Sequence, residues 1–198
     1  MALQPVLIAG AWRHSENPVG SFTAVNPATK IPLPGIYPVS GPEDIELALQ
    51  AGQEAVAGLR SVGSPAALAH FLDNFAEQIA ARADVLVETA VLETALPAEP
   101  RLRSVELPRT TNQLRQAAVA VRDGSWHQAT IDTGSNIRSM YGPLAGPVVV
   151  LGPNNFPFAF NSVAGGDFAA AIAAGNPVIA KANPGHPGTT RILAEAAF

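Results

Sequence analysis

Apolar residues recur every three to four positions from residue 41 to residue 124, which is the spacing of helices that bury one face. The pattern is most regular after Ser64 and Pro65, where one stripe is formed by Leu68, Phe71, Leu72, Phe75 and Ile79. We therefore predict that residues 41–124 form a layer of helices.

Turn and capping residues divide this layer. A serine, a glycine and a proline at positions 40–42, followed by two acids, predict a helix that runs to about Gly58. A second helix is expected to begin after Ser64, and Asp84 is expected to cap a third that ends near Ala95.

The last helical stretch of the layer is predicted from Arg101 to Arg122, with Gly124 at its end. One face of this stretch carries Leu114, Ala117, Ala118 and Val121. Pro108 lies inside it, so the proline either interrupts the helix or begins its second half.

Extended structure is predicted on both sides of the helices. Residues 1–40 contain short apolar runs between glycine and proline turns, including a hairpin that turns at residues 9–10. Apolar and polar side chains alternate in Trp126–Ile131 and Asn136–Tyr141, which is typical of strands. We expect an extended arm at residues 1–40 and a β-arm at residues 125–145.

Residues 146–198 have the pattern of a strand, a turn, a helix and a second strand. Val148–Leu151 is an unbroken apolar run, typical of a strand buried on both faces, and Val178–Ala180 resembles it. Between them an alanine-rich helix is expected after Pro157, with Gly175 at its end. These features predict an α/β fold in which residues 146–198 begin a parallel, Rossmann-type sheet.

Two glycines, Gly165 and Gly166, fall inside the helix predicted after Pro157. Each would cost about 1 kcal/mol relative to alanine in a helix interior. We expect close packing of the helix against the sheet to be the reason for them.

Polar residues follow both predicted strands at the point where each strand ends. Asn155 comes after the first, and Lys181, one of only two lysines in the chain, ends the second. Ligands bind outside the carboxyl ends of the strands in open α/β sheets, so this edge is the predicted site. Two plainer interpretations stay open: Asn155 as a helix N-cap, and Lys181 as a lysine that extends to solvent.

The chain contains few charged residues. Charged residues make up 14% of the chain, against about 25% in typical soluble domains. So little charge suggests that part of the surface is covered by further chain or by partner subunits.

The helix predicted at residues 190–198 has no stop signal before Phe198. We therefore expect the chain to stop within an element, unless this is an ordinary terminal helix.

The residue content also excludes several classes of function. The 198 residues contain no cysteine, which excludes disulfides, thiolate metal sites and a thiol nucleophile within them. The four histidines lack metal-ligand spacing, and scattered arginines form no basic stripe for nucleic acid. Prolines and glycines break the uncharged stretch from Ser139 to Gly166, so no membrane helix is expected, and a cytoplasmic location is the default.

The predicted site contains NFP after a GP turn, followed by AAAIAAGNPVIAKA, and Trp12 and VNPAT lie near the start of the chain. In these segments the sequence resembles the aldehyde dehydrogenase superfamily. The segments SVAGGDFAAAIAAG, KANPGHPGTT, PRTTNQLR and DGSW resemble the branch of α-ketoglutaric semialdehyde (2,5-dioxovalerate) dehydrogenases. Leu107 and Pro108, just before RTT, depart from the branch pattern.

The resemblance implies an aldehyde-dehydrogenase-like fold and a role for each polar residue. Asn155 would donate its amide to the oxyanion formed when a thiolate adds to the aldehyde. Lys181 would contact the adenosine ribose or a 2′-phosphate of NAD or NADP. The coenzyme cleft would be lined by Leu151, Gly152, Pro153, Asn154, Asn183 and Pro184.

The position of Pro184 matters for the choice of coenzyme. Family members that prefer NAD often carry a glutamate there, which binds the ribose hydroxyls and repels a 2′-phosphate. Proline does neither, so both NADP and NAD are allowed. Arg109 and Arg115 are further candidates, for a substrate carboxylate, although solvated helix arginines are the more common case.

The family's cysteine nucleophile, its glutamate base and its glycine-rich nucleotide turn have no counterpart here, and no G-x-G-x-x-G occurs in the chain. We therefore interpret residues 1–198 as the N-terminal portion of an NAD(P)-dependent aldehyde dehydrogenase, with the catalytic domain absent. The full form is expected to oxidise α-ketoglutarate semialdehyde as a homo-oligomer. The alternative is a non-catalytic remnant or interaction module that keeps the scaffold without activity.

Overall fold

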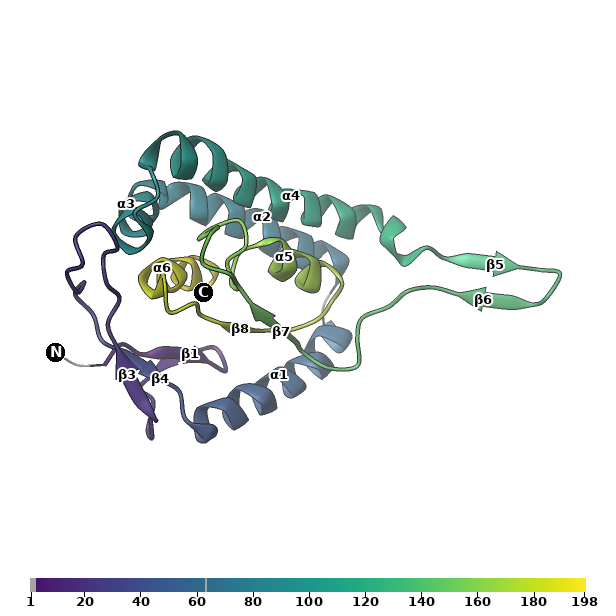
Figure 1. The fold of residues 1–198 in the computed structure, drawn as a ribbon. Coiled ribbons are helices and arrows are strands. Elements are labelled where there is room, and N and C mark those ends of the chain that lie inside the picture. Colours follow the sequence, from purple (N-terminus) through teal and green to yellow (C-terminus); the bar gives the residue numbers. More distant parts are fainter. Residues whose placement is uncertain (1–2, 63) are drawn as a thin grey trace.

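The computed structural model describes residues 3–62 and 64–198 as layers of helices stacked on a small parallel sheet, with a long arm projecting from one side (Figure 1). The sheet consists of β7 (Val148–Leu151) and β8 (Val178–Lys181), which pair in parallel. Helix α5 (Gly166–Ala173) connects them and packs against both strands, as expected for a βαβ unit. This unit positions the predicted site.

The helices above α5 form the layer that the periodicity predicts for residues 41–124, except for the first helix of that range, which lies on the other side of the sheet (Figure 1). Helices α2 and α4 lie side by side along their length, and α3 and α6 pack together at one end (Figure 1). The bounds of these elements are α2 (Pro65–Ala81), α3 (Ala83–Thr94), the π-helical segment η1 (Ala98–Glu106), α4 (Leu107–Asp123) and α6 (Pro187–Ala197).

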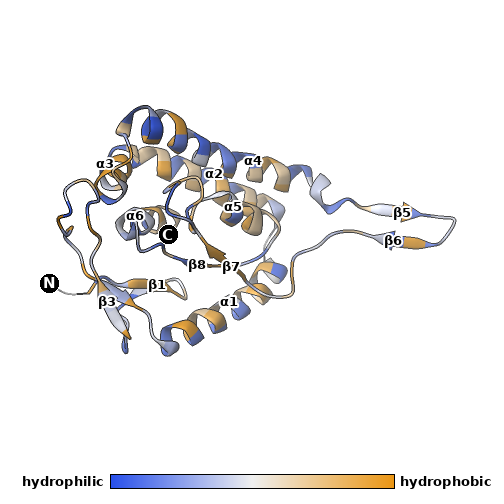
Figure 2. Ribbon diagram, in the orientation of Figure 1, coloured by the Kyte–Doolittle hydropathy of each residue, from blue (hydrophilic) through white to orange (hydrophobic). Residues whose placement is uncertain are grey.

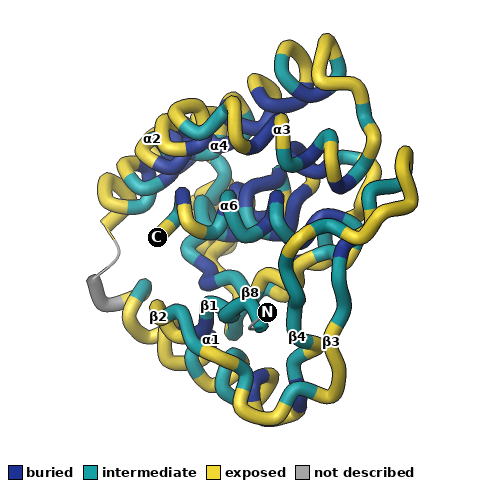
Figure 3. The backbone as a smooth tube through the Cα atoms, turned by 90° about the vertical axis from the view of Figure 1, so that its left-hand side faces the viewer, coloured by how far each residue is buried: buried dark blue, intermediate teal, exposed yellow. Residues whose placement is uncertain are grey.

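The hydrophobic core lies between these helices, and the buried parts of the backbone meet there in Figure 3. Its largest side chains include Leu72, Phe75, Leu86, Leu114 and Leu193, all of them fully or almost fully buried. Burial of each such side chain contributes roughly 1.5–3 kcal/mol. The core therefore fixes α6 and the loop before it against the helical layer.

Helix α1 (Pro42–Val62) covers the opposite side of β8 and also contacts the N-terminal hairpin. It runs past Gly58, where we had expected it to end. The hairpin predicted at residues 6–13 is confirmed: β1 (Val6–Ile8) and β2 (Ala11–Arg13) pair antiparallel. A second pair, β3 (Gly20–Phe22) and β4 (Tyr37–Val39), follows it.

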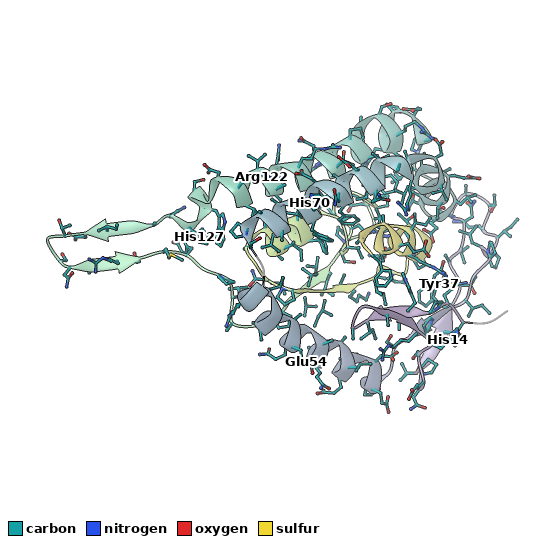
Figure 4. The ribbon with its side chains drawn as sticks, turned by 180° about the vertical axis from the view of Figure 1, so that it is seen from behind. His14, Tyr37, Glu54, His70, Arg122 and His127 are labelled. Atoms are coloured by element: carbon teal, nitrogen blue, oxygen red, sulfur yellow. The ribbon has the colours of Figure 1, made fainter. Side chains whose placement is uncertain are left out.

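The projecting arm is the hairpin of β5 (Thr130–Asp132) and β6 (Ile137–Ser139), shorter than the two predicted strands. The first predicted strand is shorter because its beginning forms the 3₁₀ turn η2 (Ser125–His127). Figure 4 shows His127 at the base of the arm, where its Nδ1 lies 2.7 Å from the carbonyl oxygen of Tyr141.

The capping predictions have mixed outcomes. Ser64 is confirmed as the N-cap of α2, since its hydroxyl accepts from the amide of Ala67 at 3.2 Å. Gly124 is confirmed at the end of α4, with a φ of 69°. Asp84 was wrongly predicted as a cap, because α3 begins one residue earlier and places Asp84 in its first turn.

Two predictions for the sheet region are wrong. Strand β7 is not buried on both faces: Val149 and Leu151 are 54% and 68% exposed, and only Val150 is buried. The same expectation is wrong for β8, in which Val178 and Ile179 are half-buried and Ala180 is exposed. The reason for the exposure of β7 is that the sheet has only two strands in the described residues, and α1 packs against β8 rather than β7. One face of β7 is therefore left uncovered. The helix predicted after Pro157 begins only at Gly166, because residues 157–164 form successive turns.

This later start moves the two glycines out of the helix interior. Gly165 is the N-cap of α5, and Gly166 is its first residue. A Cβ atom on Gly165 would lie only 2.7 Å from the carbonyl oxygen of Asn161 and 2.8 Å from that of Ala159. Close packing does explain Gly165, but the neighbour is the chain's own turn rather than the sheet.

Among the described residues, no helix combines the length and the hydrophobicity needed to cross a bilayer.

Candidate functional site

The loops that carry the predicted site residues leave the sheet side by side. Leu151 pairs with Lys181 in the parallel register, so β7 and β8 end at the same level. Lys181 is exposed, as are Pro153, Asn154 and Asn155 in the loop after β7. The carboxyl edge of the sheet is therefore an open polar surface formed by two neighbouring loops.

A side-chain bridge holds these two loops together. The Nδ2 of Asn183, after β8, donates to the carbonyl oxygen of Gly152, after β7, at 2.9 Å. The Oδ1 of Asn183 accepts from the amide of Gly185 at 2.9 Å. Both ends of the amide are used, so the orientation of Asn183 is fixed. Asn183 thus couples the β7 turn to the β8 turn.

Gly152 itself is required by close packing. A Cβ atom there would lie 2.7 Å from the carbonyl oxygen of Phe160 and from the amide nitrogen of Ser162. The turn at residues 160–162 therefore folds back directly onto the end of β7.

His186, which we assigned to no role from the sequence, makes a second tie between the loops. Its ring is buried, and its Nε2 lies 3.1 Å from the carbonyl oxygen of Pro153. A carbonyl oxygen can only accept, so this nitrogen carries the proton. The other nitrogen, Nδ1, lies 3.3 Å from the hydroxyl of Thr190.

A buried carboxylate holds the start of α6, which follows the β8 loop. Glu93 of α3 accepts from the amides of Gly188 and Thr189 at 2.7 and 2.8 Å, and from the Thr189 hydroxyl at 2.8 Å. Burial raises the pKa of Glu93, although the bonds from Thr189 and Gly188 lower it in part. Burial also raises the pKa of Tyr37, with Glu93 as a second cause.

The turn that contains Asn155 is held by a second buried carboxylate. Glu106, at the end of η1, has a fully buried side chain. Its Oε1 accepts from the amides of Phe158 and Ala159 at 2.8 and 3.0 Å, and its Oε2 pairs with Arg101. Arg101 in turn donates to the carbonyl oxygen of Asn155 at 2.9 Å. One ion pair therefore binds both ends of the segment 155–159.

Two arginines and two phenylalanines surround this turn. The guanidinium of Arg101 lies 4.3 Å from the ring centre of Phe156. That of Arg109 lies 4.9 Å from the ring of Phe160 and 5.5 Å from the ring of Phe156. These distances are within the range of cation–π contacts. Arg109 thus contacts the aromatic rings of the turn that carries Asn155, whereas Arg115 is exposed on α4.

One interpretation of Asn155 is wrong: it does not cap a helix. The residues after it form turns, and the next helix starts at Gly166. No helix begins at the residues that directly follow Asn155, so Asn155 does not cap one there. Its exposed side chain is positioned by the anchored turn instead.

Sequence reasoning missed three residues that organise this edge: Arg101, Glu106 and His186. Each acts through contacts more than 30 positions away along the chain. The only local signal was a charged residue, Glu106, at a position that continues the buried face of a helix. Within the part of the chain that the structure describes, no three histidine, aspartate or glutamate side chains gather into a metal site.

Comparison with known proteins identifies one family. The model of the aldehyde dehydrogenase family matches residues 12–198. The chain is 40% identical to alpha-ketoglutaric semialdehyde dehydrogenase 2 of Azospirillum brasilense, over 89% of this chain and 35% of the relative. It is 43% identical to alpha-ketoglutaric semialdehyde dehydrogenase of Acinetobacter baylyi, over 65% of this chain and 25% of the relative.

A solved structure gives the same result for the fold. The crystal structure of a mutant of aldehyde dehydrogenase C from Pseudomonas syringae, in complex with NAD+ and octanal, superposes with a TM-score of 0.84 at 25% identity. The match covers 98% of this chain and 38% of that one. The chain therefore spans well under half the length of each of these proteins.

Proposed function

Because the chain belongs to the aldehyde dehydrogenase family, we propose that it forms the N-terminal part of an NAD- or NADP-dependent aldehyde dehydrogenase. In its full form the enzyme oxidises α-ketoglutarate semialdehyde to 2-oxoglutarate. The observation that carries this substrate is the 40% identity to alpha-ketoglutaric semialdehyde dehydrogenase 2 across nearly all of the chain.

Asn155 is the proposed oxyanion donor. When a thiolate adds to the aldehyde carbon, negative charge develops on the former carbonyl oxygen, and a neutral amide fixed in advance stabilises it. The support from the structure is that Asn155 is exposed at the carboxyl edge of the sheet while its backbone is held by Arg101.

The proposed coenzyme contacts come from the two coupled loops. The residues fit one side of a dinucleotide: the Lys181 side chain is exposed at the end of β8, and the exposed residues Pro153 and Asn154 face solvent beside it. When bound, NAD or NADP would supply a hydride acceptor. Lys181 would contact the ribose, and Pro184, which is exposed, would leave room for a 2′-phosphate.

The second candidate function is that of a non-catalytic remnant or interaction module. The observation that favours it is the absence of any cysteine from the 198 residues. For the same reason, the purified chain alone should show no aldehyde-dependent reduction of NAD or NADP. It should also bind NADP more weakly than about 1 mM, or about −4 kcal/mol, because the contacts of half a cleft must still offset the cost of immobilising the ligand.

A chimera separates the two functions. Residues 1–198 replace the matching segment of the Azospirillum brasilense enzyme, which supplies the remaining length, and oxidation of α-ketoglutarate semialdehyde is followed by coenzyme absorbance. We expect activity. In this chimera Asn155→Ala should lower kcat about 100-fold or more, and Lys181→Ala should mainly raise the coenzyme KM.

The matched control in the chimera is Asn112→Ala, which removes the same side chain from an exposed position on α4. It should leave kcat within about two-fold, since Asn112 lies outside the proposed oxyanion and coenzyme contacts. A folded chimera without activity would favour the non-catalytic module. An active chimera that tolerates Asn155→Ala would contradict the oxyanion assignment.

We further propose that the full form is a homo-oligomer in the cytoplasm. The support is the arm, whose strands carry hydrophobic residues on their surface (Figure 2), with Ile131 and Ile137 70% and 54% exposed. Exposed apolar surface of this kind marks interaction sites. Ile131→Asp with Ile137→Asp in the chimera should lower the oligomer mass measured by light scattering, and an unchanged mass would contradict a role of the arm.

A further inference from the structure

The ion pair between Arg101 and Glu106 is largely removed from solvent. The carboxylate of Glu106 is fully buried and the side chain of Arg101 is 25% exposed. Burial of charged groups carries a desolvation cost, which is offset only when the remaining lone pairs and protons find partners. Here they do: the carboxylate accepts two amides, and the guanidinium donates to a carbonyl and lies over an aromatic ring.

All of these partners belong to the turn that carries Asn155. The guanidinium holds the carbonyl of Asn155, and it covers the ring of Phe156. The carboxylate holds the amides of Phe158 and Ala159. Residues 155–159 have no regular secondary structure of their own. Their backbone geometry therefore depends on an ion pair that comes from a different element, η1.

The pair is itself fixed to the helical layer. The hydroxyl of Thr110, in α4, donates to the carbonyl oxygen of Glu106 at 2.9 Å. Leu102 and Leu107, on either side of Glu106, are buried in the hydrophobic core. The helical layer thus sets the position of the carboxylate, and the carboxylate sets the position of the turn.

We propose that Glu106 and Arg101 are positioning residues for Asn155. This inference rests on the proposed function, because it assigns to the pair the task of holding the oxyanion donor in place. Neither residue touches the reacting atoms. Glu106 acts through the backbone of Phe158 and Ala159, and Arg101 acts through the carbonyl of Asn155.

The first test uses the 198-residue chain and nuclear magnetic resonance relaxation of its backbone amides. In the unsubstituted chain the amide of Asn155 should have an order parameter of about 0.85, typical of rigid backbone. Glu106→Gln should lower it below about 0.6, because the neutral amide no longer holds Arg101. Arg101→Lys keeps the charge beside Glu106 but loses the planar fork, and it should lower the value by a smaller amount.

The matched control is Glu99→Gln. Glu99 lies in the same segment η1 and loses the same charge, but it is exposed and pairs with Arg103 at 3.6 Å. The order parameter of Asn155 should not change in this variant. If Glu106→Gln and Arg101→Lys both leave Asn155 as rigid as the control does, the pair does not position it.

The second test measures kinetic coupling in the chimera. Glu106→Gln should lower kcat about 10-fold or more when Asn155 is present, because small displacements of a catalytic group are costly. The same substitution should lower kcat less than about two-fold in the Asn155→Ala background, where nothing is left to position. A purely structural role would lower kcat equally in both backgrounds, and that result would overturn the proposal.

The two tests also distinguish failure of the positioning role from failure of the proposed function. If the unsubstituted chimera is inactive, or if Asn155→Ala has no effect, the proposed function fails, and the relaxation data still decide whether the pair orders the turn. If the chimera is active and Asn155→Ala lowers kcat, an equal effect of Glu106→Gln in both backgrounds refutes the positioning role alone.

Discussion

A methyl group added at Gly165 should destabilise the protein strongly, although the backbone angles there suit any residue. Gly165 has a φ of −73° and a ψ of −179°, which is ordinary extended backbone. The obstacle is space: an added Cβ would lie 2.7 Å from the oxygen of Asn161, and 2.8 Å from both the oxygen of Ala159 and the carbonyl carbon of Phe160. All three are backbone atoms of one tight turn, so no side chain can rotate away.

The size of the effect follows from these contacts. Overpacking by one or a few methylenes typically costs about 1–3 kcal/mol, and here the upper end applies because backbone must move. Gly166 provides a matched comparison, since its added Cβ would meet only the Gln113 side chain, at 3.4 Å from Nε2. Gly166→Ala should be neutral or stabilise by up to about 1 kcal/mol, because alanine reduces the entropy of the unfolded chain.

Urea denaturation followed by circular dichroism measures both variants. For Gly165→Ala we expect a free energy of unfolding about 2–3 kcal/mol below that of the unsubstituted chain, with the m-value unchanged. For Gly166→Ala the midpoint should stay or rise. If the two variants behaved alike, the steric reasoning would be wrong, and helix propensity would be the better explanation.

Further predictions concern the core, a titrating group and a helix cap. Leu114→Ala should lower the free energy of unfolding by about 2–5 kcal/mol in the same assay, because Leu114 is fully buried in the core, and a loss below about 1 kcal/mol would contradict that packing. The raised pKa of Glu93 means that the folded state retains the proton to a higher pH than the unfolded chain, so the stability of the unsubstituted protein relative to Glu93→Gln should fall as the pH rises from the ordinary value of 4.5 through the raised pKa. Denaturation of both proteins at a series of pH values checks this. The prediction would be refuted if the stability of the unsubstituted protein relative to Glu93→Gln rose with pH. Ser64→Ala should cost about 1 kcal/mol through the lost bond to the amide of Ala67, and Ser64→Thr, which keeps the hydroxyl, should restore most of it.

The helical layer could be predicted from the sequence because its signals are local. The stripe from Leu68 to Ile79 and the caps at Ser64 and Gly124 lie within a few positions of the helices they define. The start of α5 could not be predicted in the same way. Alanine-rich sequence favours helix from Pro157 onwards, but the amides of Phe158 and Ala159 bond to Glu106, more than 50 positions away. A tertiary bond overrode the local propensity.

The candidate site could be predicted in outline and not in detail. The positions of Asn155 and Lys181 after two apolar runs placed them at one edge of a parallel sheet, and the register confirms that the two strands end together. The exposure of β7 was missed because an apolar run reports the preference of its side chains, not the number of neighbouring strands. The contacts of Arg101 and His186 were missed because their partners lie 54 and 33 positions away, and such contacts leave no repeating pattern in the sequence.

The bridge between the two loops has a consequence for engineering coenzyme preference. Asn183 uses both ends of its amide, one on Gly152 and the other on Gly185. Replacing Asn183 would therefore alter the β7 turn as well as its own loop. Pro184 lies between Asn183 and Gly185, which bond to each other, and it is exposed. Under the proposed coenzyme role, a library aimed at the preference between NAD and NADP would vary position 184 and keep Asn183 and Gly185, because Asn183 makes the bridge and a Cβ atom on Gly185 would lie 3.2 Å from the Oδ1 of Asn183.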